Sequence, residues 1–137
     1  MKLWIDDVRP APEGYVWCKS VNIAKNILCK LADTYVVDVY SSNKPYFTTL
    51  CHGEKDLNSL REMWPDVRVL EHVDPVELID IDHDAGDYAC DGGDYIKLLD
   101  WLEETGRNYP IRIHSANAVG VENMRRIIQG NGWKEVF

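Results

Sequence analysis

From residue 77 onwards the chain alternates apolar, strand-like segments with amphipathic ones, and this alternation constrains the fold more than any other feature. Residues 77–82 and 111–115 each contain two isoleucines and read as strands. Residues 94–104 and the segment after Asn117 carry apolar side chains at helical spacing. A last strand is expected at 133–137. This order is typical of an α/β fold on a mainly parallel sheet, in which ligands bind at the carboxyl ends of the strands.

The first part of the chain predicts two more strands and a helix. Residues 2–6 and 15–19 are largely apolar and read as strands, and the prolines and glycine of 8–14 predict a turn between them. Ser20 is placed to cap a helix that follows it. The short link favours antiparallel pairing of the two strands, because a parallel pair usually needs a longer crossover.

Residues 33–75 follow a less regular pattern. Strands are expected at 35–40 and 46–51, joined as a hairpin, and another short strand at 67–70. Between them, apolar residues at helical spacing predict a helix that Pro65 stops.

The composition sets limits on what the chain binds. Its 137 residues suit one domain, and 15 basic against 23 acidic residues give a net charge of −8. An acidic chain lacks the basic face that tracks a nucleic-acid backbone, so non-specific binding to DNA or RNA is not expected. No apolar run is long enough to span a membrane, and the opening carries two aspartates, unlike a signal peptide. The four cysteines show no metal-binding spacing, which predicts reduced thiols and a cytoplasmic location.

Polar side chains gather at three predicted strand ends that lie far apart in the sequence. In chain order they are Asp6, Asp7, Asp82, His83, Asp84, His114, Ser115 and Asn117. Clustered carboxylates repel one another, and a hard divalent cation such as Mg²⁺ relieves that repulsion while accepting phosphate oxygens. We therefore predict that Asp6, Asp7 and Asp82 bind Mg²⁺ or Mn²⁺. The alternative is that these acids are solvated turn residues.

Two histidines and the start of a helix predict the rest of a phosphate site. An imidazole titrates near neutral pH, so His83 and His114 are predicted to act as a general acid–base pair. Ser115 and Asn117 precede a helix whose N-terminal N–H groups attract anions, and we predict that both bind phosphate. The alternatives are a structural role for each histidine and simple helix capping by Asn117.

A calcium loop is a competing interpretation of the aspartates. Asp80, Asp82 and Asp84 alternate as in an EF-hand, and Asp91 stands at the twelfth position. However, Ala85 replaces the glycine expected at the sixth position, and the preceding segment is strand-like. This interpretation is therefore not favoured.

Three segments of the chain resemble the cyclic-phosphate-processing receiver-like domains, in the order in which that family has them. They are residues 3–14 (LWIDDVRPAPEG), 81–86 (IDHDAG) and 114–120 (HSANAVG). The family is similar to the response-regulator receiver. The resemblance therefore implies a flavodoxin-like, three-layer α/β fold with a mainly parallel central sheet, and it implies parallel pairing of the strand at 15–19.

The resemblance also implies roles for the strand-end residues. Asp6 and Asp7 correspond to the acidic metal pair of a receiver, Asp82 to its phospho-acceptor, and Ser115 to the hydroxyl residue that contacts the phosphoryl group. The residues that the family adds to a plain receiver, and that imply action on cyclic phosphates, are His83, Asp84, His114 and Asn117. With Asp84 included, the predicted metal ligands are Asp6, Asp7, Asp82 and Asp84.

The chain departs from the family pattern in several places. Ala118 stands where the family usually has proline, and Ala85 where it has leucine, although neither carries a functional group. Residues 33–75 look like an insertion into a single domain spanning 1–137, and they could form a lid or a surface for a protein partner. A receiver also keeps a lysine near its last strand, where this chain has Lys134.

These observations predict a magnesium-dependent, phosphoesterase-type enzyme acting on a cyclic phosphate or a related phosphodiester. Its ligand would be a small phosphorylated molecule, and a covalent route through phosphorylated Asp82 is open. Two alternatives are a signalling module that accepts phosphate on Asp82, and a metal- or nucleotide-binding domain without catalysis.

Overall fold

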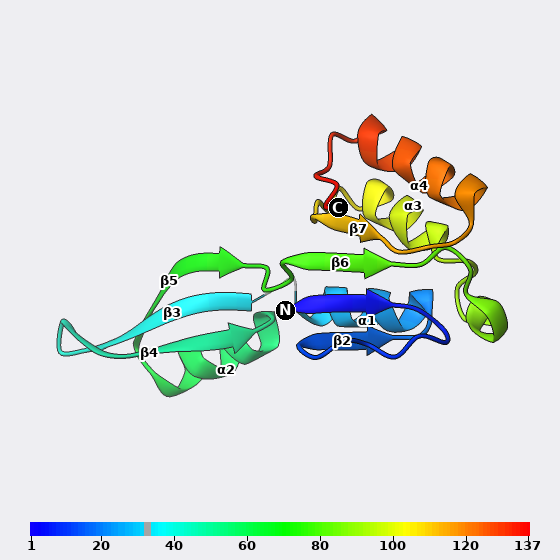
Figure 1. Cartoon of the computed structure of the whole chain (residues 1–137). Coiled ribbons are helices and arrows are strands. Elements are labelled where there is room, and N and C mark those ends of the chain that lie inside the picture. The colour runs from blue at the N-terminus through cyan, green and yellow to red at the C-terminus, as the bar shows by residue number, and fades with distance from the viewer. Residues whose placement is uncertain (32–33) are drawn as a thin grey trace. The chain divides into compact units, whose positions relative to one another are not determined.

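The computed structural model describes residues 1–31 and 34–137, and the chain forms two compact units. Unit 1 comprises Met1–Asn26 and Val76–Phe137, and unit 2 comprises Ile27–Pro75. Unit 1 holds a parallel four-stranded sheet in the order β2-β1-β6-β7 (Figure 1). Its strands are β1 (Lys2–Ile5), β2 (Tyr15–Cys18), β6 (Leu78–Ile81) and β7 (Ile111–Ile113). The predicted α/β fold on a mainly parallel sheet is confirmed.

The pairing of β2 settles the direction that the sequence leaves open. Lys2 lies opposite Tyr15 and Ile5 opposite Cys18, so β1 and β2 are parallel. Residues 6–14 connect them without a helix. Each strand has only four residues, which span about 13 Å at 3.3 Å per residue. The nine-residue link can cross that length, so the antiparallel pairing that its shortness favours is wrong here.

The order of the strands in unit 1 follows the flavodoxin-like pattern 2-1-3-4-5 in its first four positions. The predicted strand at 133–137 is wrong, because this segment forms only an isolated parallel bridge between Glu135 and Ile111. Since β7 has only three residues, it offers a short edge for a fifth strand. The Lys134 carbonyl accepts from the Ile111 N–H, so Lys134 lies at the amino end of β7.

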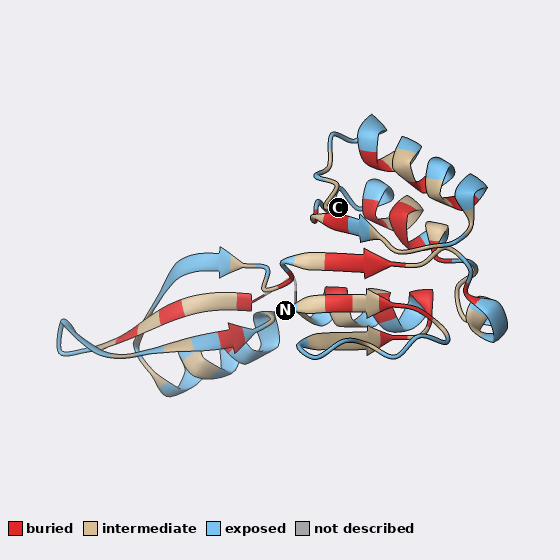
Figure 2. Ribbon diagram, viewed as in Figure 1, coloured by how far each residue is buried: buried red, intermediate tan, exposed pale blue. Residues whose placement is uncertain are grey.

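Three α-helices have faces that form the core with the parallel sheet. They are α1 (Val21–Leu31), of which Val21–Asn26 belong to unit 1, α3 (Ile96–Glu104) and α4 (Ala118–Gly130). The Ser20 hydroxyl accepts from the Ile23 N–H at 3.1 Å, which confirms Ser20 as the cap of α1. β6 is paired on both edges and buried along most of its length (Figure 2). Fully buried side chains include Leu3, Ile5, Ile79, Ile81, Leu98, Leu99, Leu102 and Met124.

Unit 2 is an antiparallel sheet with one helix. Its elements are β3 (Thr34–Ser41), β4 (Lys44–His52), α2 (Glu54–Met63) and β5 (Asp66–Val73), with strand order β4-β3-β5. Ser42 and Asn43 have positive φ and close the predicted hairpin. Val37, Cys51 and Leu57 form its core. That residues 33–75 are an insertion stays a prediction, and residue 33 itself lies outside the described residues.

The helix lengths and the cysteine thiols bear on two expectations from the composition. The longest helix in the described ranges, α4, has 13 residues, and none of the helices there could cross a bilayer. All four cysteines are free thiols. Burial raises the pKa of Cys18 to about 12, which makes this thiol unreactive near neutral pH.

Candidate active site at the strand ends

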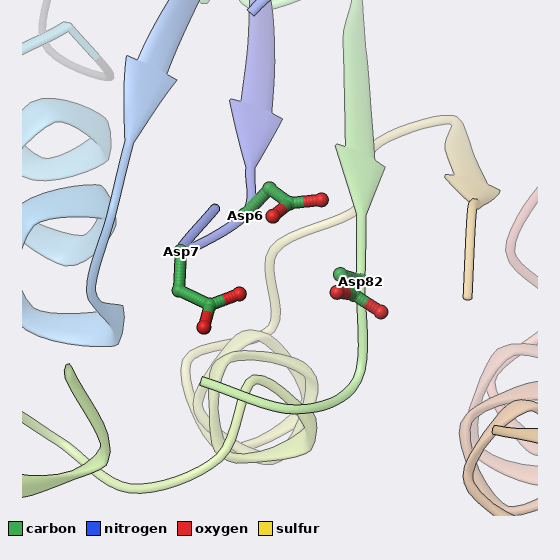
Figure 3. Close-up of side chains that lie close together, drawn as sticks. All are labelled: Asp6, Asp7 and Asp82. Carbon is green, nitrogen blue, oxygen red and sulfur yellow. The ribbon is translucent and has the colours of Figure 1, made fainter. Parts of the chain in front are cut away.

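Three aspartates meet where β1 and β6 end. Asp6 and Asp7 directly follow β1, and Asp82 directly follows β6. Because Ile5 pairs with Ile81 in neighbouring strands, the residues after them emerge at one edge of the sheet. Each of the three offers a carboxylate oxygen, and these oxygens lie within 4.8 Å of one another (Figure 3). We call Asp6, Asp7 and Asp82 the aspartate trio. It contains three of the four predicted metal ligands.

Asp6 is the buried member of the trio, with 1% of its surface exposed. Its Oδ1 accepts from the backbone N–H groups of Val8 and Arg9, both at 2.9 Å, and its Oδ2 lies 2.9 Å from Nε2 of His114. Burial by itself would raise the pKa of Asp6. The hydrogen bonds from Arg9, Val8 and His114, with the charge of His114, outweigh burial and hold the pKa below its ordinary 3.8. Asp6 is therefore a fixed carboxylate.

Asp7 has the opposite electrostatic character. Burial, followed by the charges of Asp6 and Asp82, raises its pKa above the ordinary 3.8. Gly86, which has a φ of +55°, lies against its carboxylate, and a Cβ at that position would collide with Asp7 Oδ2. The site thus places repelling charges together in a tight space, and a bound cation would relieve this repulsion.

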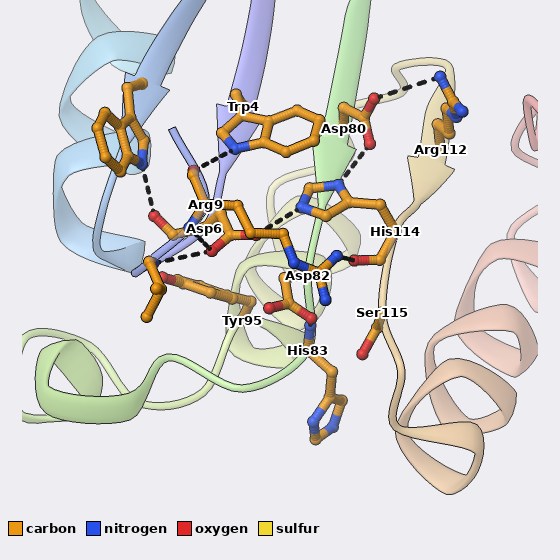
Figure 4. A network of polar contacts seen from close by, with 12 residues as sticks. Trp4, Asp6, Arg9, Asp80, Asp82, His83, Tyr95, Arg112, His114 and Ser115 are labelled. Carbon is orange, nitrogen blue, oxygen red and sulfur yellow. Dashed lines mark hydrogen bonds and ion pairs between the residues drawn. The ribbon is translucent and has the colours of Figure 1, made fainter. Parts of the chain in front are cut away.

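His114 lies between two buried carboxylates (Figure 4). Its Nδ1 is 2.6 Å from Oδ1 of Asp80, its Nε2 is 2.9 Å from Oδ2 of Asp6, and its ring stacks on Trp4 at 3.8 Å. Each ring nitrogen therefore lies within hydrogen-bond distance of a carboxylate oxygen. This arrangement leaves His114 no free nitrogen, although its predicted role in acid–base catalysis stays untested.

His83 lies in a different environment, on the side of the site where α4 begins. Its Nδ1 is 2.9 Å from Oδ1 of Asp84, and no protein group within the described ranges bonds its Nε2. The hydrogen bond with His83 is the main cause that lowers the pKa of Asp84 below 3.8. In Figure 4 the ring of His83 points away from His114, so the two histidines do not form a facing pair. Asp84, predicted as a fourth metal ligand, thus contacts His83 and is not in the trio.

Ser115 and Asn117 stand at the start of α4, as predicted. Asn117 Oδ1 accepts from the Gly120 N–H at 2.9 Å, so Asn117 caps the helix. Its Nδ2 lies 3.4 Å from Nδ1 of His83 and from both carboxylate oxygens of Asp84, which links the cap to the Asp84–His83 pair. The Ser115 hydroxyl accepts from the Asn117 N–H at 3.2 Å and stays partly exposed. Phosphate binding by these two residues stays a prediction.

Asp80 is the site residue that the sequence reasoning missed. It lies within β6, only 1% exposed, and pairs with His114 and, at 3.8 Å, with Nη1 of Arg112. The signal in the sequence is a carboxylate inside an apolar strand, since a buried charge needs a partner. Its position removes the calcium-loop interpretation, and Asp91 in turn bonds Ser20 and Asn22.

Replacing Gly120 with alanine is expected to destabilise the protein by about 1–3 kcal/mol, because a Cβ there would collide with the His83 ring. Gly130, on the same helix, has open space around its Cβ position. Gly130→Ala is therefore the matched control, and we expect it to be neutral or stabilising. Urea unfolding of both variants measures the difference. Equal effects on the free energy of unfolding would show that His83 is not held by Gly120.

The comparisons with known proteins identify a family. The family model of the cyclic-phosphate processing receiver domain matches residues 59–130, which include β6, β7 and α4. Asp6 and Asp7, which directly follow β1, lie before the matched segment. No curated protein and no solved structure matches the chain.

Proposed function

The chain belongs to the family of cyclic-phosphate processing receiver domains, and we propose that it is a Mg²⁺- or Mn²⁺-dependent enzyme that hydrolyses a cyclic phosphate or a related phosphodiester. One observation supports this most strongly. The aspartate trio lies at the same edge of the sheet as a histidine that is oriented by a carboxylate and whose Nε2 bonds no protein group among the described residues. The first element suits a divalent cation, and the second suits proton transfer.

The donors of the trio fit magnesium or manganese. All three are hard carboxylate oxygens within 4.8 Å of one another, and none comes from a thiolate or an imidazole. Burial and then the charges of Asp6 and Asp82 raise the pKa of Asp7, and a cation would remove the part that comes from those charges. When bound, the ion would polarise a phosphoryl oxygen and orient the attacking water.

His83 is the proposed proton-transfer residue. Asp84 bonds its Nδ1 and thereby fixes the ring, which leaves Nε2 to exchange a proton with water or with the leaving oxygen. Ser115 and the free N–H groups at the start of α4 would donate to the phosphoryl oxygens as charge develops on them.

His114 takes a different role in this proposal from the one that the sequence predicts. Since both its nitrogens bond carboxylates, we assign it as a positioning residue that holds Asp6 at the edge of the trio. Asp80 and Trp4 fix the ring in turn, one through Nδ1 and the other by stacking.

A phosphorylated signalling module is the second candidate. Asp82 follows β6, the third strand of the sheet order, where a receiver keeps its phospho-acceptor. Lys134, however, lies beside the first residue of β7, at the end of the strand opposite the trio, so it does not serve as a receiver's site lysine. The enzyme is therefore the better-supported proposal. A protein partner for residues 33–75 and a cytoplasmic location stay predictions.

We expect His83→Ala to lower the hydrolysis of cyclic phosphates by about 10²- to 10⁴-fold, because it removes the proton-transfer group. Nucleoside 2′,3′-cyclic and 3′,5′-cyclic phosphates are suitable substrates, with Mg²⁺ present. Mg²⁺ affinity should stay unchanged, since His83 is outside the trio. His72→Ala, at an exposed histidine of β5, is the matched control. Equal turnover by His83→Ala and wild type would contradict the role of His83, and turnover by neither would contradict the enzyme.

A further inference from the structure

Arg9 is fixed at the site by its backbone. Its N–H donates to Oδ1 of Asp6 at 2.9 Å, and its carbonyl accepts from Nε1 of Trp4 at 2.8 Å. Asp6 belongs to the trio, and Trp4 stacks on His114. The Cα of Arg9 is therefore held by the same residues that build the site.

The side chain of Arg9 is held less tightly than its backbone. Its Nη1 makes one long contact of 3.4 Å with the carbonyl of His114, the residue before Ser115. A guanidinium carries five N–H donors and is always charged. Across the two described ranges of the chain, no carboxylate lies within 4 Å of this guanidinium, although Asp6 and Asp7 are nearby in sequence. Figure 4 shows the side chain extending from the loop after β1 toward the segment that contains Ser115.

The charges at the site explain why such an arginine is needed. Three carboxylates and one divalent cation sum to −1 (−3 + 2), and a phosphodiester adds a further −1. An anionic ligand would thus approach a site of its own sign. Arg9 supplies the compensating charge, and its planar fork matches two phosphoryl oxygens.

We infer that Arg9 binds the anionic phosphoryl oxygens of the ligand, beside Ser115 and opposite the trio. This inference rests on the proposed function, because it takes a phosphate ester as the ligand. A competing role is purely structural: Arg9 would only tie the loop after β1 to the segment after β7. The two roles differ in what they predict for metal binding.

The test is calorimetry on the full chain with two probes, Mg²⁺ alone and inorganic phosphate in saturating Mg²⁺. For Arg9→Ala we expect phosphate to bind about 10- to 100-fold more weakly, as expected for a lost charge-assisted hydrogen bond. Mg²⁺ alone should bind equally well or more tightly, because a cation near the trio has been removed. Arg9→Lys should fall between, since it keeps the charge and loses the fork. Arg126→Ala removes the same charge from an exposed pair on α4 and should match wild type.

Three results would overturn the inference: phosphate binding that Arg9→Ala leaves unchanged, no phosphate binding by wild type at millimolar concentrations, and equal weakening of Mg²⁺ and phosphate in Arg9→Ala. The last would show a structural tie. If Arg9→Ala does not fold, Arg9→Lys against wild type decides, with equal phosphate affinity overturning the inference. Phosphate binding that depends on Arg9 in a protein without turnover would contradict the proposed enzyme and leave the Arg9 site standing.

Discussion

His114→Leu is expected to lower the free energy of unfolding by about 3–5 kcal/mol at neutral pH, the range for a buried charge that loses its partner. Asp6 and Asp80 are each 1% exposed, and His114 bonds both. Leucine has a similar size but offers neither carboxylate a hydrogen bond. The stacking of the ring on Trp4 is lost as well. Urea unfolding at pH 7 measures the effect.

The pH dependence of this loss separates the charge effect from simple loss of packing. In wild type the pKa of Asp6 is lowered, so its contribution to stability is present above pH 3.8 and is lost as the pH falls through the folded value. In the variant a carboxyl group without His114 takes up a proton more readily. The difference in the free energy of unfolding between wild type and variant should therefore become smaller from pH 7 toward pH 4. A difference that stays constant over this range would contradict the charge effect and indicate packing alone.

His114→Gln provides a second comparison at the same position. Glutamine has one amide group that can donate to one carboxylate, so it should recover part of the lost stability. His72→Leu, at an exposed position, controls for the general effect of replacing a histidine.

Asp82→Asn is expected to weaken Mg²⁺ binding by at least about 100-fold and to leave the fold intact. Two unit charges 4 Å apart interact by roughly 4 kcal/mol at an effective dielectric constant of 20, and the ion carries two. Asparagine keeps the size of the side chain. Its amide oxygen can still accept from the His83 N–H, as Asp82 Oδ1 does at 2.8 Å. Calorimetry with Mg²⁺ and Mn²⁺, alongside circular dichroism, measures both quantities.

Asp84→Asn is the control for this prediction, because it removes a carboxylate of the same strand-end segment that is not in the trio. We expect it to change Mg²⁺ affinity by less than about tenfold, below the range for groups that support metal ligands, because Asp84 contacts His83 and is not in the trio. Equal losses of Mg²⁺ affinity in the two variants would place Asp84 among the ligands, as the sequence predicts. They would contradict the proposal that the trio supplies all the protein ligands of the metal.

The sequence predicts the elements of unit 1 well because local patterns determine them. The apolar strands at β1 and β6, the cap at Ser20 and the cap at Asn117 all depend on residues close to one another in the chain. The meeting of Asp6, Asp7 and Asp82 follows from one further rule, that parallel strands end at one edge.

What the sequence does not predict depends on contacts between distant residues. The two nitrogens of His114 bond Asp6 and Asp80, which are 108 and 34 positions away, and no local pattern indicates either bond. The segment 133–137 has the composition of a strand, yet the three residues of β7 give it only one bridge. Likewise, the contact of the Arg9 side chain with the His114 carbonyl appears only once the loops are placed.

In the proposed function, divalent cation binding and phosphate-ester hydrolysis belong to one site, and phosphorus NMR on the wild-type protein tests this most directly. A nucleoside cyclic phosphate is incubated with the metal-free protein, then with Mg²⁺, then with EDTA. We expect the phosphomonoester signal to grow only while Mg²⁺ is present. Its growth should resume when Mg²⁺ is restored. Conversion that continues in EDTA, or no conversion while calorimetry shows Mg²⁺ bound, would contradict the proposed function.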